Sequence, residues 1–372
     1  MFLASQVHAT SLATLLQEMD SLRANASYDA SAKTGLYADT RKGADGTRYH
    51  YAVWVPEDYN PNKSYSLILV LHGLVDRDKG SQRQAIPGLL KQLHQQDAIM
   101  LFPAAWRKAK WWQTPQVDNL LSLIEETKAK YHVDSNKIFV EGVSDGGHGT
   151  YYLAAHAPTL FAGFIPMIGS PFVAAKENGA SHDTFLVNLL NKPMLVLNAE
   201  FDKFYDIGQH KSFADTMVRN GAQLDFHELK GAHHDVNWYP SVHNLITDFI
   251  QHTQRNPYPD SFYWEVDSEL NYPRFHWLLI ESVPQGTGRH LINARREGNR
   301  IFIDAENIAS FRLLISPEMF NFDHTLEVSV NGQWVYQSQP IPDPAILHKW
   351  FERDNDVQQL YGAEILIKVP VQ

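Results

Sequence analysis

Between residues 66 and 229 the chain carries short runs of consecutive apolar residues, each about as long as a β-strand. Runs that do not alternate with polar residues are typical of strands buried on both faces, as in a parallel sheet. Segments with apolar residues at helical spacing lie between these runs, and strands that alternate with helices predict an α/β domain. The predicted strands are 66–71, 98–102, 137–140, 161–167, 193–197 and 224–229, and the predicted helices are 117–131, 210–220 and 240–254.

The pattern changes on both sides of this region. Before it, two strand-like runs flank Asp45-Gly46, which predicts a β-hairpin over 35–55. After Asn256-Pro257, short alternating runs flank Asn331-Gly332, which predicts a second hairpin in a mainly-β region with a short helix near 344–351. Near the N-terminus, an apolar stripe at helical spacing predicts a short amphipathic helix; it consists of Leu12, Leu15, Leu16 and Met19. We therefore expect an N-terminal helical segment at 1–29, an α/β domain at 30–255 and a smaller, mainly-β accessory domain at 257–372.

A glycine-rich segment, Gly142-Val-Ser144-Asp-Gly146-Gly147, follows one predicted strand and precedes a helix-like run. The pattern G-x-S-x-G between a strand and a helix is typical of a nucleophilic serine at a tight turn. Backbones pass close together at such a turn and leave no room for a Cβ, which explains glycine at positions 142 and 146. Ser144 is therefore the candidate nucleophile, and a glycine–serine turn without function is the alternative.

A serine nucleophile of this type is followed along the chain by an acid and then by a histidine. Asp202 lies in the loop after the predicted strand 193–197 and is the candidate acid. Glu200 and Asp206 lie in the same loop and are its competitors. A turn or helix-capping aspartate is the structural alternative for Asp202.

Two adjacent histidines, His233 and His234, are the candidates for the general base. Alignment of Gly231-Ala-His233-His234 with the common ending Gly-x-Gly-His favours His234, and His233 remains the alternative. The two histidines and Asp235 could also bind a metal, but the chain has no His-Glu-x-x-His motif and no third cluster at a recognisable spacing. We therefore expect a Ser–His–Asp site with no metal and no organic cofactor.

Acyl transfer also requires two backbone N–H groups that bind the oxyanion. One expected donor is Asp145, which follows the candidate nucleophile directly. The other is Leu74, in the loop that begins His72-Gly73 after the predicted strand 66–71, with Gly73 as the alternative. A His-Gly pair after a buried strand is typical of such an oxyanion loop.

Two tryptophans, Trp111 and Trp112, lie in the loop after the predicted strand 98–102. In a parallel sheet this loop opens onto the same edge as the nucleophile, which makes both residues candidates for substrate binding. The alternative is a place in the core, where aromatic residues are found more often.

These segments together resemble the α/β-hydrolase superfamily, and within it the bacterial carboxylesterases related to polyhydroxybutyrate depolymerases and prolyl-oligopeptidase-type peptidases. The matching residues are Leu71-His-Gly73, the stretch from Val133 to Gly147, Asp202 and His234, and the resemblance covers about 50–250. It implies an α/β-hydrolase fold, with a mostly parallel central sheet flanked by helices, and a serine hydrolase that forms an acyl-enzyme. The mainly-β region resembles, more weakly, the C-terminal extensions of some of these esterases.

The expected function is that of a short-chain carboxylesterase. A serine peptidase of the prolyl-oligopeptidase type and a polyester depolymerase are the enzymatic alternatives. A non-catalytic binding protein on a hydrolase scaffold is the alternative from another class, and the complete set of Ser, Asp and His argues against it.

Composition and charge restrict the partners that we expect. The chain has 372 residues and a formal net charge of −10, which disfavours general binding to nucleic acid or anionic membranes. It contains no cysteine, which excludes disulfides, thiolate metal sites and a cysteine nucleophile. No run approaches the ~18 apolar residues of a membrane helix, and no signal-peptide pattern begins the chain. We expect a small-molecule ester substrate and a cytoplasmic location, or a periplasmic or secreted one after removal of a signal.

Overall fold

The structure is a computed structural model that describes residues 11–78, 97–177, 184–286 and 288–370. Contacts divide the chain into two compact units. Residues 27–256 form one unit. The other combines helix α1 (Leu12–Ala24) with the residues from Pro257 onward. Each unit has its own hydrophobic core.

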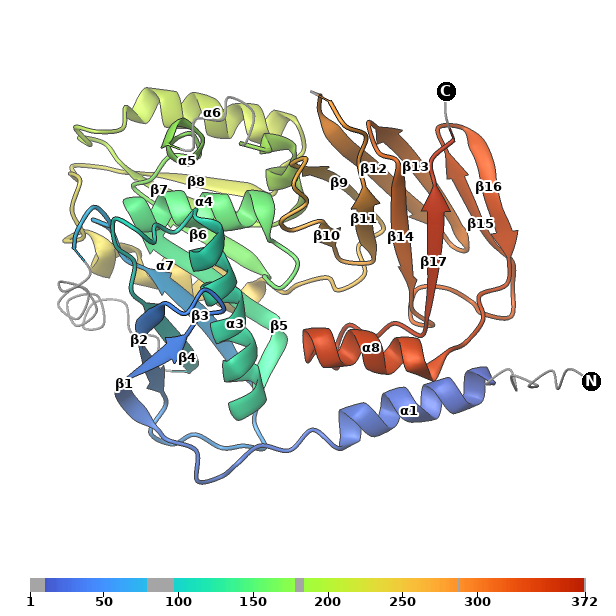
Figure 1. Ribbon diagram of the computed structural model, residues 1–372. Coiled ribbons are helices and arrows are strands. Elements are labelled where there is room, and N and C mark those ends of the chain that lie inside the picture. The colour runs from blue at the N-terminus through green and yellow to red at the C-terminus, as the bar shows by residue number, and fades with distance from the viewer. Residues whose placement is uncertain (1–10, 79–96, 178–183, 287, 371–372) are drawn as a thin grey trace, which may run out of the picture. The chain divides into compact units, whose positions relative to one another are not determined.

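An eight-stranded sheet forms the centre of the unit 27–256 (Figure 1). Its strands are β1 (Gly35–Lys42), β2 (Arg48–Val55), β3 (Tyr65–Leu71), β4 (Ala98–Pro103), β5 (Val133–Val143), β6 (Gly163–Met167), β7 (Met194–Ala199) and β8 (Leu224–Leu229). Their spatial order is β1-β2-β4-β3-β5-β6-β7-β8. Strands β1 and β2 form the predicted antiparallel hairpin, and all neighbours from β4 to β8 in this order are parallel. The mostly parallel sheet expected from the apolar runs is thereby confirmed.

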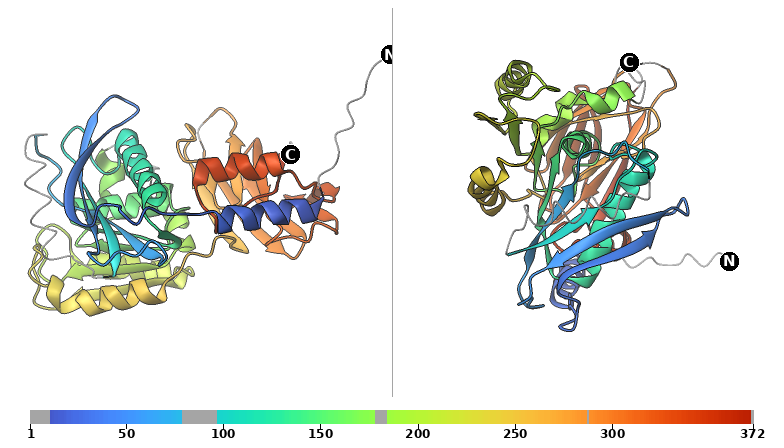
Figure 2. Two further views of the ribbon diagram at one scale, coloured as in Figure 1. Left: turned by 90° about the horizontal axis from the view of Figure 1, so that it is seen from below. Right: turned by 90° about the vertical axis from the view of Figure 1, so that its left-hand side faces the viewer.

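Helices cover both faces of this sheet, which explains why its central strands are continuous apolar runs. Figure 2 shows α3 (Thr114–Lys130) and α7 (Tyr239–His252) on opposite faces. On the face covered by α7, the helix residues Val242 and Ile246 share one core with Ile165 and Leu195 of the sheet. The remaining helical segments are α4 (Asp145–His156), α5 (Val173–Glu177), α6 (Ile207–Arg219) and the 3₁₀ helix η2 (Leu186–Asn191).

The parallel arrangement positions the candidate site. Because β3, β5, β7 and β8 run in the same direction, their carboxyl ends meet at one edge of the sheet. The loops that follow these four strands contain Gly73, Ser144, Asp202 and His234. In open α/β sheets this edge is the usual place for a binding site.

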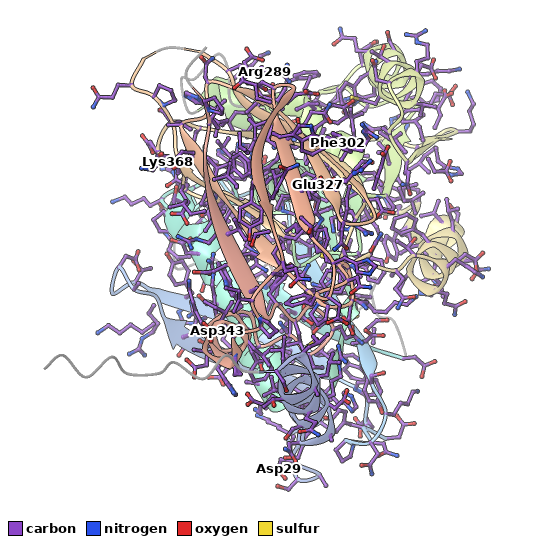
Figure 3. The ribbon with its side chains drawn as sticks, turned by 90° about the vertical axis from the view of Figure 1, so that its right-hand side faces the viewer. Asp29, Arg289, Phe302, Glu327, Asp343 and Lys368 are labelled. Atoms are coloured by element: carbon purple, nitrogen blue, oxygen red, sulfur yellow. The ribbon has the colours of Figure 1, made fainter. Side chains whose placement is uncertain are left out.

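The second unit contains two sheets whose buried faces share one core. One has the order β10-β11-β14-β17 and the other β16-β15-β13-β12-β9. The strands are β9 (Ser261–Val266), β10 (Arg274–Phe275), β11 (Leu278–Ser282), β12 (His290–Glu297), β13 (Arg300–Glu306), β14 (Ser310–Ile315), β15 (Leu326–Val330), β16 (Gln333–Ser338) and β17 (Ala363–Lys368). Phe302 on β13 and Glu327 on β15 mark two of these strands in Figure 3. This mainly-β architecture is the one that the alternating pattern predicts.

Helix α1 packs into this second unit. Its residues Leu15 and Met19 are buried in the same core as Leu347 and Trp350 of α8 (Pro344–Asp354). Arg23, in the last turn of α1, forms an ion pair with Glu318. The apolar stripe thus makes a helix as predicted. None of the helices that the structure describes has the length and apolar character of a membrane span.

Candidate active site

Ser144 lies at the junction of β5 and α4, in a backbone conformation that is rare for a residue with a side chain. Its φ is 57° and its ψ is −115°, and its N–H donates to the carbonyl of Met167 at 2.9 Å. Such a positive φ is strained in L-residues and is found at functional turns. Neighbouring backbones enclose the turn: a Cβ on Gly142 would lie 2.2 Å from the carbonyl oxygen of Gly146, and one on Gly146 would lie 1.9 Å from that of Leu71. The predicted need for glycine at both positions is confirmed.

The hydroxyl of Ser144 faces a histidine that is itself bound to a carboxylate. Ser144 Oγ lies 2.9 Å from His234 Nε2, and His234 Nδ1 lies 2.7 Å from Asp202 Oδ2. When Nδ1 donates to the carboxylate, Nε2 presents its lone pair to the serine hydroxyl, which is the tautomer that a general base requires. His233 is exposed, and its ring lies against Phe201 at a centroid distance of 5.6 Å.

Asp202 is held by its own loop. Its side chain is fully buried, and Oδ1 accepts hydrogen bonds from the backbone N–H groups of Phe204 at 2.8 Å and Tyr205 at 3.2 Å. The loop therefore wraps around the carboxylate and leaves Oδ2 for His234. These bonds orient the carboxylate toward the imidazole ring.

The two competing carboxylates have other partners. Glu200 accepts a hydrogen bond from the N–H of Gly231 at 2.8 Å and forms an ion pair with Lys230. The bond from Gly231 is the main reason why the pKa of Glu200 is lowered. Asp206 caps helix α6, because its side chain accepts from the N–H of Gln209 at 2.8 Å. Both residues therefore have structural roles in the loops around the site.

The loop after β3 is fixed by His72, whose ring is 3% exposed. Its Nδ1 donates to the carbonyl of Gly73 at 2.7 Å, and its Nε2 accepts from the N–H of Ala105 at 3.0 Å. The bond that Nε2 accepts requires a neutral ring, and burial lowers the pKa of His72 to about 4. Trp111 adds a third bond, from its Nε1 to the carbonyl of His72 at 2.9 Å. His72 thus holds the loop without carrying a charge at neutral pH.

The same loop lies directly over the serine. A Cβ on Gly73 would lie 3.1 Å from Ser144 Cβ, so the peptide that precedes Leu74 passes close to the candidate nucleophile. Leu74 has a φ of 58°. The next N–H, from Val75, donates to Asp145 Oδ2 at 2.8 Å. Asp145 begins α4, so its carboxylate ties the loop after β3 to the turn that carries Ser144.

A buried histidine links three further segments around the site. His148 Nδ1 accepts from the N–H of Ser170 at 2.8 Å, and Nε2 lies 2.8 Å from the hydroxyl of Tyr205. Helix α4, the loop after β6 and the loop of Asp202 are connected in this way. The sequence contains no motif that identifies Tyr205 as the partner of His148.

The two candidate tryptophans are buried. Trp111 is 0% exposed and Trp112 is 2% exposed. Trp111 donates to the loop after β3, as described above, and Trp112 packs near the ring of His148 with centroids 6.1 Å apart. They support the walls of the site, and their direct contact with a substrate stays a prediction.

A buried acid lies on β5, three residues before Ser144. Glu141 is fully buried, and desolvation raises its pKa to about 8, an effect that the nearby Tyr239 hydroxyl partly offsets. The carboxyl group is therefore mainly protonated at neutral pH.

Within the part of the chain that the structure describes, no three His, Asp or Glu side chains are grouped in a way that could hold a metal ion.

Comparison with known proteins relates this unit to known hydrolases. Residues 75–238, which include Ser144, Asp202 and His234, match the dienelactone hydrolase family. A poly(3-hydroxybutyrate) depolymerase from Ralstonia pickettii is 31% identical over 155 residues, which are 36% of this chain and 31% of that protein. Dipeptidyl-peptidase 5 from Porphyromonas gingivalis is 29% identical over 243 residues, 55% of this chain and 34% of that protein. The chain thus spans about a third of the length of these two relatives.

Among solved structures, a Bacteroides ovatus protein described provisionally as a dipeptidyl aminopeptidase IV superposes with a TM-score of 0.50 at 19% identity. The superposition covers 61% of this chain and 37% of that one. The sheet order, the serine at the β5–α4 turn and the family match agree with one another. The unit 27–256 therefore has the α/β-hydrolase fold.

Proposed function

We propose that this protein is a carboxylic ester hydrolase that acts on small esters with short acyl groups through an acyl-enzyme. The observation that carries the proposal is the continuous chain of hydrogen bonds from Ser144 through His234 to Asp202. A serine hydroxyl is a weak nucleophile unless a base removes its proton, and this chain of bonds provides such a base.

In the proposed mechanism, Ser144 Oγ attacks the ester carbonyl while its proton moves to His234 Nε2. Asp202 stabilises the imidazolium that forms, and the N–H groups of Leu74 and Asp145 bind the oxyanion. When the tetrahedral intermediate collapses, the bond to the alcohol oxygen breaks and His234 returns the proton to that oxygen. A water molecule then attacks the acyl-enzyme with His234 as base, which releases the acid and restores Ser144.

The preference for short acyl groups is supported by the segment between β6 and β7, the place where a cap over the site could be inserted. In its described part, Phe185 and Leu189 are buried, and Phe172 is the large apolar residue with an exposed side chain. A site for a long acyl chain needs a larger apolar surface than this.

A serine peptidase is the second candidate, because one relative is a dipeptidyl-peptidase. One panel separates the two functions: nitrophenyl acetate, butyrate, octanoate and dodecanoate, with a peptide nitroanilide. We expect the highest kcat/KM for acetate or butyrate and a much lower value for the nitroanilide, with all activity lost in Ser144→Ala. A higher kcat/KM for dodecanoate would contradict the short-acyl assignment, and a preference for the nitroanilide would favour the peptidase.

A further inference from the structure

An exposed aromatic ring lies beside the proposed general base. The ring of Phe204 is centred 4.8 Å from that of His234, in an edge-to-face arrangement. Although it makes this contact, Phe204 is 62% exposed. Phe201, two residues after the end of β7, is 56% exposed, and its ring lies against that of His233. A substrate bound at His234 would cover the exposed Phe204 ring, and burial of apolar surface stabilises binding.

The position of Phe204 is fixed by the same loop that holds the acid. Its backbone N–H donates to Asp202 Oδ1 at 2.8 Å, and the next residue, Tyr205, is held by its hydroxyl bond to His148. The ring itself lies against that of His234, and Lys203 Nζ lies 5.0 Å from its centroid. Because the bond to Asp202 uses the backbone, a change of the Phe204 side chain leaves the support of the acid in place.

The chemistry of ester cleavage determines which part of a substrate lies near this ring. His234 Nε2 must deliver its proton to the oxygen of the departing alcohol, so that oxygen lies within hydrogen-bond distance of Nε2 at this step. The carbon atoms attached to the oxygen then continue past the imidazole ring. A phenylalanine that packs against the imidazole is therefore placed to contact the alcohol group, whereas the acyl group lies on the other side of the scissile bond.

We propose that Phe204 forms a leaving-group subsite that selects esters of apolar, ring-bearing alcohols. The inference rests on the proposed ester hydrolysis and adds to it the class of alcohol. It assigns specificity to the alcohol half of the substrate and leaves the short acyl preference unchanged. Contact between two aromatic rings is favourable beyond the apolar area that it buries.

Two isomeric esters test this subsite without a difference in size or composition. In 2-phenylethyl acetate the phenyl ring is in the alcohol, and in ethyl phenylacetate it is in the acyl group. The quantity measured is the ratio of their kcat/KM values, first ester over second. We expect this ratio to fall about tenfold in Phe204→Ala, and to be kept in Phe204→Tyr, which retains the ring. Comparison of variants cancels the different intrinsic reactivities of the two esters.

Phe172→Ala is the matched control. Phe172 is also an exposed phenylalanine on a loop at this edge, but its ring packs on Phe213 of α6 at 5.6 Å. We expect this variant to keep the wild-type ratio within about twofold. A melting temperature near that of the wild type shows for each variant that the fold is retained.

The outcomes separate this inference from the function on which it rests. If the wild type hydrolyses these esters but the ratio is unchanged in Phe204→Ala, or falls equally in Phe172→Ala, the leaving-group subsite is wrong and ester hydrolysis stands. If the wild type hydrolyses neither isomer and no nitrophenyl ester, both proposals fall. A ratio that falls in Phe204→Ala alone supports the subsite.

Discussion

The carboxylate of Asp145 offers a sharp test of how the oxyanion loop is held. Its backbone N–H is one proposed oxyanion donor, and its side chain binds the N–H of Val75, next to the other donor, Leu74. Leu74 has a positive φ, which costs an L-residue roughly 1 kcal/mol. The backbone at Leu74 would therefore relax to a negative φ if the bond between Val75 and Asp145 were lost. Asp145→Ala removes the tie and keeps both donor N–H groups.

The magnitude follows from this one bond. A hydrogen bond to a charged group contributes about 1.5–3 kcal/mol, and the Asp145 side chain is 27% exposed, so the lower end of that range applies. Since each 1.36 kcal/mol is tenfold in rate, kcat should fall about tenfold. An upper limit is the loss of about 10²–10³ that follows removal of a whole oxyanion donor in a serine protease. KM should change little, because the oxyanion forms only after the substrate has bound.

The assay is steady-state hydrolysis of nitrophenyl acetate, with kcat and KM determined separately and the melting temperature measured for each variant. Asp145→Asn is the matched control: it loses the negative charge at the start of α4 but keeps an acceptor for Val75. We expect it to retain kcat within about threefold of the wild type. A kcat of Asp145→Ala within twofold of the wild type would refute the reasoning. Equal losses of kcat in both variants would show that kcat depends on the negative charge of Asp145 and not on its hydrogen bond to Val75.

Three further predictions concern the base and the two cores. His234→Ala should lower kcat by at least about a thousandfold, while His233→Ala, the adjacent control, stays within about tenfold in the same ester assay; the reverse order would move the base to His233. Because the pKa of Glu141 is raised to about 8, the wild type should lose stability as pH rises from about 5 to 8, and Glu141→Gln should not. Melting temperatures across this range should diverge in favour of Glu141→Gln, and parallel curves would count against a raised pKa of Glu141 in the folded protein. Leu15→Ala should lower the free energy of unfolding in urea by about 2–5 kcal/mol, whereas Leu16→Ala, at a position 41% exposed, should cost less than about 0.5 kcal/mol; equal costs would contradict the packing of α1.

Local patterns were sufficient to predict the elements that depend on neighbouring residues. The apolar runs predict buried parallel strands because burial on both faces leaves no polar positions. The Asn331-Gly332 turn is a similar case: both residues have positive φ, 49° and 80°, which is the conformation that a two-residue hairpin requires. The glycines around Ser144 were predictable for the same reason, since the close backbone contacts there exclude a Cβ.

Contacts between distant parts of the chain could not be predicted in this way. The stripe of α1 predicts a helix, but nothing in it indicates that Leu15 packs into a core formed more than two hundred residues later. The contacts of the Asp145 carboxylate and of the Phe204 ring could not be predicted for the same reason. Their partners, Val75 and His234, become neighbours only when the loops after different strands meet at one edge of the sheet.

The central claim is that Ser144 is a nucleophile activated by His234 and Asp202, and covalent labelling tests it most directly. The folded protein is treated with a fluorophosphonate, and the adduct is located by mass spectrometry of the intact chain and of its peptides. We expect one adduct per chain, on Ser144, with none after heat unfolding and a strongly reduced rate in His234→Ala. A folded wild-type protein that stays unlabelled, or that is labelled at another residue, would contradict the account.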